Sequence, residues 1–133
     1  MQRVLISGDT RYPLNRKVVR QAVEDTLTRN KISSDEIEVS VTVIGKRKMR
    51  ALSSQYMKDG LDHEVLSFPL EEITQDSGKG FVNAPDDILR LGDVVLSWPQ
   101  VVALAGTEDI MVDDEVYKLV AHSVEHLLGK HHE

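Results

Sequence analysis

The sequence has 133 residues, of which 41% are hydrophobic and 29% charged, and this suits a single domain spanning residues 1–133 with its own core. It contains no Cys, which excludes disulfides and thiolate metal sites, fits a cytoplasmic location and leaves His and carboxylates as ligands for any transition metal. The net charge of −6 is uneven: residues 1–58 carry twelve Lys and Arg against six Asp and Glu, which suits a polyanionic partner or is simply a solvated surface.

The first half of the chain alternates strand and helix patterns. Residues 3–7 are typical of a short strand, and a helix is expected to start between Thr10 and Pro13 and to carry an apolar stripe as far as Leu27. Residues 37–44 alternate apolar and polar side chains, as a half-buried strand does. A second helix is expected around Met49, Leu52 and Tyr56. Its outer face is basic and is a candidate RNA surface or a solvated helix face.

The second half begins with a strand at 65–69, which a proline ends. Residues 70–90 form the longest polar, irregular segment and are expected to be a flap. Another strand is predicted at 94–97, and a last helix at 113–128, opened by three acidic residues and ended by Gly129. This order predicts an α+β fold, a small mixed sheet of about four strands with packed helices. No stretch is long enough to span a membrane.

Four of the five histidines lie in the last twelve residues. His122 and His126 stand at i and i+4, so both imidazoles lie on one helix face and can reach one ion. At 100° per residue, the pair borders the apolar face of the helix. After Gly129 the chain can turn back and offer a third imidazole from His131 or His132. The pattern therefore predicts a metal site at the C-terminal helix.

Three His ligands leave the fourth tetrahedral position of Zn²⁺ open to water, which is the arrangement of catalytic zinc sites. Four exposed histidines in a frayed terminus are the alternative. A metalloprotease of the His-Glu-x-x-His type would carry its general base directly after the first histidine, and Ser123 stands there. Glu125 is predicted to point away from the apolar face, so the protease base is missing.

Three segments resemble the YbeY family of metal-dependent endoribonucleases. Residues 122–132, His-Ser-Val-Glu-His-Leu-Leu-Gly-Lys-His-His, are similar to the family's His-Gly-x-Leu-His-Leu-x-Gly-Tyr-Asp-His, with His132 in the third-ligand place. Residues 63–69, His-Glu-Val-Leu-Ser-Phe-Pro, and residues 91–97, Leu-Gly-Asp-Val-Val-Leu-Ser, resemble two further family motifs. Tyr56 also matches the family's spacing. The resemblance covers the chain from about Glu38 to the end.

The resemblance implies a zinc ion held by His122, His126 and His132. It also implies single-strand endoribonuclease activity in rRNA maturation and ribosome quality control, with rRNA and the small ribosomal subunit as partners. The family has an Arg directly after its Tyr, which is thought to serve the phosphate. Here Met57 stands in that place, and Lys58 follows as the candidate catalytic residue or as a solvated surface side chain. Lys can act as a point charge but cannot make a bidentate contact.

Two other functions remain open from the residues alone. The first is a ribosome-associated RNA-binding or assembly factor with a structural or vestigial metal, which the loss of the family Arg favours. The second is a metal hydrolase that acts on a peptide or a small phosphoester. The missing glutamate after His122 counts against a protease.

Overall fold

The computed structural model describes residues 2–32, 37–69 and 89–129. Within these ranges the strands are β1 (Gln2–Gly8), β2 (Ile37–Ile44), β3 (Val65–Pro69) and β4 (Leu89–Ser97). The helices are α1 (Arg16–Arg29), α2 (Lys46–Leu52), α4 (Trp98–Glu108) and α5 (Val112–Leu127), and a π-helical turn, η1 (Ser53–Met57), follows α2. The predicted α+β class, with one four-stranded mixed sheet, is confirmed.

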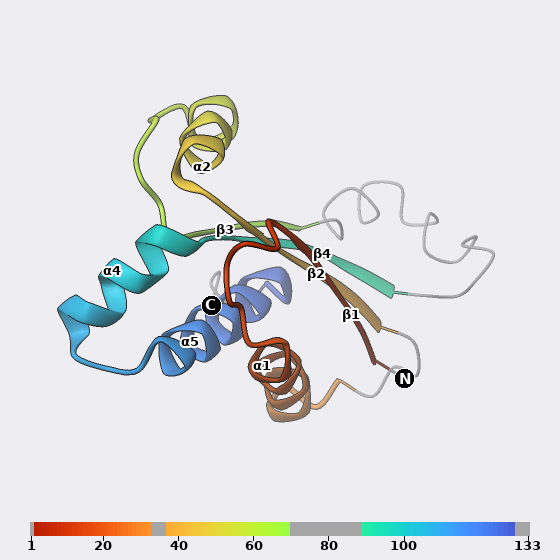
Figure 1. The fold of residues 1–133 in the computed structure, drawn as a ribbon. Coiled ribbons are helices and arrows are strands. Elements are labelled where there is room, and N and C mark those ends of the chain that lie inside the picture. The colour runs from red at the N-terminus through yellow and green to blue at the C-terminus, as the bar shows by residue number, and fades with distance from the viewer. Residues whose placement is uncertain (1, 33–36, 70–88, 130–133) are drawn as a thin grey trace.

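The sheet has the order β1-β2-β4-β3, in which β1, β2 and β4 run parallel and β3 is antiparallel to β4. Figure 1 shows α1 and α5 side by side on one face of the sheet and α2 above the other face. Alternate residues of β2 point to the main core, and the residues between them face the side of α2. The face opposite α1 and α5 is called the α2 face below.

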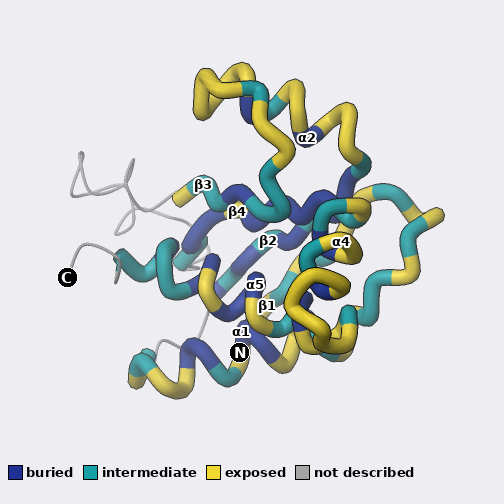
Figure 2. Tube along the Cα trace, turned by 90° about the vertical axis from the view of Figure 1, so that its left-hand side faces the viewer, coloured by how far each residue is buried: buried dark blue, intermediate teal, exposed yellow. Residues whose placement is uncertain are grey.

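The main core lies between the sheet and helices α1 and α5, where Figure 2 shows the buried segments. Its fully buried side chains include Leu27, Val41, Leu96 and Val120. A smaller core joins α2 to the α2 face through Met49, which is fully buried against residues of β2, β3 and β4. Helix α2 lies over one end of the sheet only (Figure 1).

Two expected elements differ at their starts. Helix α1 begins at Arg16, not between residues 10 and 13, because the Asn15 side chain accepts hydrogen bonds from the backbone N–H groups of Lys17 and Val18. Strand β4 begins at Leu89, five residues before the expected start, so the predicted irregular segment is two residues too long. Its residues 70–88, the expected flap, lie outside the described residues.

The prediction of a strand at 94–97 takes Gly92-Asp93 to lie before the strand. In the structure it is an irregularity inside the strand: the register with β2 shifts between Glu38 and Val39, and Gly92 has φ +144°. A Cβ at Gly92 would lie 2.3 Å from the carbonyl oxygen of Phe68 and 3.0 Å from Leu127 Cδ2. Glycine is therefore needed where β3, β4 and α5 meet.

Helix α4 is absent from the prediction, which passed directly from the last strand to the last helix. The segment 98–108 is mostly apolar, yet only Val101 and Ala105 are buried, so it carries no broad apolar stripe. Pro99 occupies the first turn, where a missing N–H costs nothing. Helix α4 ends at Asp109 in a left-handed conformation, and the chain then turns into α5.

The side chain of Tyr56 also differs from the prediction. It was predicted on the buried stripe of the second helix, but 55% of its surface is exposed. The helix changes to π geometry at Ser53, which shifts the following side chains around the axis. Tyr56 instead packs edge-on against Phe68 at a ring-centroid distance of 5.2 Å.

Candidate metal centre and nearby surfaces

The two histidines at i and i+4 are neighbours near the C-terminal end of α5. Their ring centroids lie 4.5 Å apart with the ring planes inclined by 58°. His122 is exposed and His126 is half-buried, as expected for a pair on the border of the apolar face. Two imidazoles this close can share one ion, because Zn–N bonds are about 2.0–2.1 Å long.

Helix α5 ends directly after this pair, at Leu127. The N–H of Leu128 donates to the carbonyl of Val124, and the N–H of Gly129 donates to the carbonyl of His126 at 2.9 Å. Gly129 has φ +82°, which confirms its predicted role after the helix end. His131 and His132 lie outside the described residues. Within residues 2–32, 37–69 and 89–129, no group of three potential metal ligands occurs.

The side chains between and beside the histidines serve packing. Ser123 is buried, with 3% of its surface exposed, so the position after His122 belongs to the core. Glu125 is half-buried and accepts a hydrogen bond of 3.1 Å from the side-chain amide of Asn30 at the end of α1. It was predicted to point away from the apolar face, and it joins α5 to α1. The donor set at this end of α5 is therefore imidazole alone among the described residues.

Lys58 lies directly after η1 in a left-handed conformation, with φ 59°. Its side chain is exposed, as is that of Met57 beside it. In the described part of the chain, no hydrogen bond or ion pair joins Lys58 to His122 or His126. Close by, Asp59 Oδ2 lies 3.0 Å from His63 Nε2, so the fifth histidine is engaged away from the C-terminal cluster.

The basic face of α2 is only partly available to a ligand. Arg50 makes two hydrogen bonds to Asp62, of 2.6 and 3.2 Å, and Lys46 Nζ lies 3.6 Å from the same carboxylate. The guanidinium of Arg50 lowers the pKa of Asp62, so the carboxylate stays ionised. The predicted RNA surface therefore retains Arg47 and Lys48, and the pairing across the loop was not visible in the sequence pattern.

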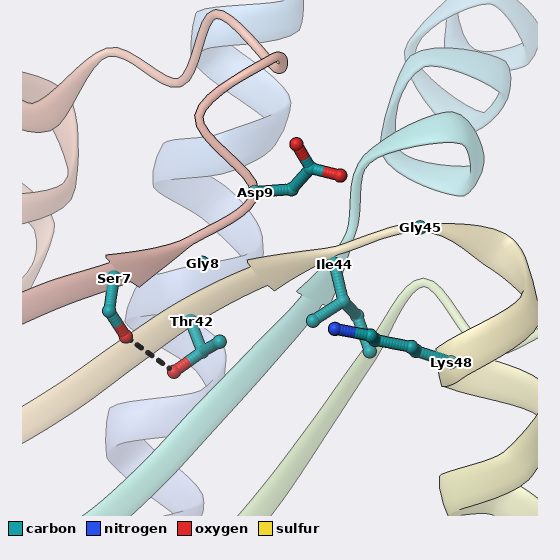
Figure 3. A pocket seen from close by; sticks show the side chains of 7 residues that line it. All are labelled: Ser7, Gly8, Asp9, Thr42, Ile44, Gly45 and Lys48. Carbon is teal, nitrogen blue, oxygen red and sulfur yellow. Dashed lines mark hydrogen bonds between the residues drawn. The ribbon is translucent and has the colours of Figure 1, made fainter.

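A pocket lies beside Lys48, at the carboxyl ends of β1 and β2 (Figure 3). It has a volume of about 360 Å³. Its lining residues come from the end of β1, the end of β2 and the start of α2: Ser7, Gly8, Asp9, Thr42, Ile44, Gly45 and Lys48. This pocket was not predicted from the sequence. The signal was available, because parallel strands place their carboxyl ends at one edge and ligands of such sheets bind there.

Asp9 is the acidic wall of this pocket. Its carboxylate is held by Arg11, whose Nη2 lies 2.6 Å and Nε 2.9 Å from the two oxygens. The hydrogen bond from the Arg11 side chain is the main reason that the pKa of Asp9 falls to about 2, and the charge of Lys48 contributes. Asp9 is therefore an anion at neutral pH, paired with Arg11 at the edge of the pocket.

A buried carboxylate lies at the other end of α5, in its first turns. Glu115 is fully buried, and within the described residues neither of its oxygens has a hydrogen-bond partner. The nearest cation is Lys118, whose Nζ lies 3.8 Å from Oε2 while it donates to Glu108 at 2.6 Å. Burial raises the pKa of Glu115, and the adjacent carboxylate of Glu108 adds to this effect.

Comparisons with known proteins find the same family over nearly the whole chain. The family model described as "Endoribonuclease YbeY" matches residues 9–133. A protein of that name from Persephonella marina is 31% identical over 137 aligned residues, covering 100% of this chain and 80% of its own. Another from Roseiflexus castenholzii is 33% identical, covering 87% of this chain and 69% of its own. The solution structure of a Thermotoga maritima protein shares the fold, with a TM-score of 0.57 at 18% identity over 93% and 71% of the two chains.

Proposed function

The chain belongs to the YbeY endoribonuclease family, and from this premise we propose that it is a zinc-dependent nuclease of single-stranded RNA that acts in rRNA maturation and ribosome quality control. Family membership makes it a hydrolase of RNA phosphodiester bonds. The zinc ion, the preference for single strands and the ribosomal context are the proposed parts. Residues 1–133 would form one catalytic domain, with rRNA and the small ribosomal subunit as partners.

The observation that carries the metal assignment is the histidine pair of α5, with ring centroids 4.5 Å apart directly before the turn at Gly129. His122 and His126 would supply two ligands and His132 the third. Three neutral nitrogen donors and no thiolate suit Zn²⁺ and leave a ligand position open. When bound, zinc polarises a phosphoryl oxygen and activates water for attack.

The chain's own side chains bind and orient the RNA. Lys58, exposed after η1, is the proposed charge beside the scissile phosphate, at one residue's distance from the place of the family Arg. A lysine ammonium attracts phosphate as a point charge without fixing its orientation. Glu125 is committed to Asn30 and Ser123 is buried, so neither contributes a base. The preference for RNA over peptide follows from the family and agrees with the missing base.

A second candidate is an RNA-binding assembly factor that keeps the metal for structure. Met57, in the place of the family Arg, favours it, because an apolar side chain gives no stabilisation of a phosphate in the transition state. The two functions differ in one property: an assembly factor binds RNA and leaves it intact, with or without metal.

The experiment is cleavage of a labelled single-stranded RNA by purified protein with zinc, with chelator, and with zinc restored. We expect cleavage that the chelator abolishes and zinc restores. His126→Ala should lose it, while His63→Ala should retain it, because His63 bonds to Asp59 outside the cluster. RNA binding without cleavage in every condition would support the assembly factor. Cleavage that persists in His126→Ala would contradict the metal assignment.

A further inference from the structure

The pocket at the ends of β1 and β2 is separate from the histidine pair. Thr42 and Ile44 lie on the α2 face, and Ile44 belongs to the small core under α2. His122 and His126 lie on α5, which packs on the opposite face (Figure 1). The pocket is therefore separate from the candidate metal site.

Two glycines keep the rim of the pocket free of side chains. A Cβ at Gly8, where φ is +119°, would lie 2.0 Å from the carbonyl oxygen of Val43. A Cβ at Gly45 would lie 2.7 Å from the hydroxyl of Tyr12. Glycine is required at Gly8 by its positive φ and the close approach of the Val43 backbone, whereas at Gly45 only the end of the Tyr12 side chain is near. With glycine at both positions, a ligand meets bare backbone at the rim.

One wall of the pocket is suited to a phosphate group. Figure 3 shows Lys48 reaching back from α2 over Ile44 towards the two hydroxyls of the strands. In the described part of the chain Lys48 has no ion pair, whereas Lys46 and Arg50 on the same helix share Asp62. The hydroxyls of Ser7 and Thr42 lie 3.2 Å apart and share one hydrogen bond, which leaves one O–H to donate.

The other wall is suited to a hydroxyl donor. Asp9 and Lys48 both line the pocket, and the Asp9 carboxylate accepts hydrogen bonds from the backbone N–H, Nε and Nη2 of Arg11, which fix it. A phosphate alone would meet repulsion from this anion. A ligand that carries a phosphate and a nearby hydroxyl satisfies both walls, and an RNA nucleotide carries both, because its ribose has a 2′-hydroxyl that DNA lacks.

We propose that this pocket binds one nucleotide of single-stranded RNA, with the phosphate against Lys48 and Thr42 and the ribose 2′-hydroxyl against Asp9. The proposal rests on the proposed function, since it takes RNA as the substrate. It adds a subsite away from the metal ligands that holds the strand and selects ribose over deoxyribose.

The test is the affinity for a labelled single-stranded RNA and for DNA of the same sequence, measured by fluorescence anisotropy in chelator so that no cleavage occurs. Lys48→Gln should weaken RNA binding about tenfold, as expected for the loss of a charged hydrogen bond. The slope of log K against the logarithm of the salt concentration should also become about 0.7 less steep, the value for one phosphate contact on a single strand. Lys17→Gln removes the same charge from an exposed position of α1, on the opposite face of the sheet, and should have a much smaller effect.

Asp9→Ala and Thr42→Val complete the test. Asp9→Ala should bring the ratio of RNA affinity to DNA affinity close to one. Thr42→Val should weaken the binding of both RNA and DNA, although Ser7 retains its hydroxyl. Equal losses in Lys48→Gln and Lys17→Gln, or an unchanged RNA-to-DNA affinity ratio in Asp9→Ala, would overturn the proposal. The nuclease assignment would stay intact if the wild-type protein still cleaves RNA. A wild-type protein that neither binds nor cleaves RNA would refute both.

Discussion

Gly92→Ala tests the account of the junction between β3, β4 and α5. The new Cβ would lie 2.3 Å from the Phe68 carbonyl oxygen and 3.0 Å from Pro69 Cα, and two backbone atoms can yield only if β3 moves. The φ of +144° belongs to a region where a non-glycine residue costs about 1–3 kcal/mol. Overpacking adds about 1–3 kcal/mol, so the two costs together predict a loss of roughly 2–6 kcal/mol in the free energy of unfolding.

The assay is urea unfolding followed by the fluorescence of Trp98, the single tryptophan, which stacks on Tyr12 at a centroid distance of 6.4 Å. Gly106→Ala is the matched control, because a Cβ there meets nothing within 4 Å. As a helical residue it should gain about 0.5–1 kcal/mol from the same substitution. If the two variants changed stability equally, or if Gly92→Ala were neutral, the reasoning from the strand irregularity would be refuted.

Three further predictions concern α1 and α5. Asn15→Ala should cost about 1–2 kcal/mol in urea unfolding, because it removes the cap of α1 and the 3.0 Å bond to Asp113; a cost near zero would contradict the capping role. Glu115→Gln should raise stability at neutral pH by about 1 kcal/mol, since a neutral amide is cheaper to bury than a carboxylate without hydrogen-bond partners among the described residues. Burial raises the pKa of Glu115 in the folded protein, so the cost of its ionisation begins above the unfolded value of 4.5 and is complete above the folded pKa. The advantage of Gln should therefore shrink as the pH falls from the folded pKa towards 4.5 and be gone below it. An advantage that grew in acid would contradict this sign.

The local patterns predicted those elements whose residues face one core. Strand β2 has the expected bounds because its alternation matches its burial, and α5 carries the acidic first turn and the glycine stop that the sequence indicated. The missed helix α4 buries little, and the missed half of β4 holds a glycine irregularity that resembles a turn. Both are settled by neighbours distant in sequence, which a single-sequence pattern does not contain.

The candidate site also has features that local geometry predicts and features that depend on the whole fold. The closeness of His122 and His126 depends only on helical geometry, so the sequence predicted it. How much of the basic face of α2 is available to RNA depends on Asp62, which lies beyond η1 and forms ion pairs with Lys46 and Arg50. This pairing became visible only in the fold. The pocket of Ser7, Asp9 and Lys48 likewise requires the register of β1 on β2. The role of Lys58 beside the phosphate and that of His132 as the third metal ligand stay predictions.

The metal content of the purified protein tests the central claim most directly. Elemental analysis of the wild-type chain should find close to one zinc ion per chain, and His126→Ala should lose it while its unfolding transition in urea remains cooperative. His63→Ala, the control outside the cluster, should retain the metal, because His63 bonds to Asp59. His131→Ala and His132→Ala identify the third ligand, and we predict the loss in His132→Ala. Absence of zinc in the wild-type protein, even after zinc is supplied, or full zinc in His126→Ala, would contradict the account.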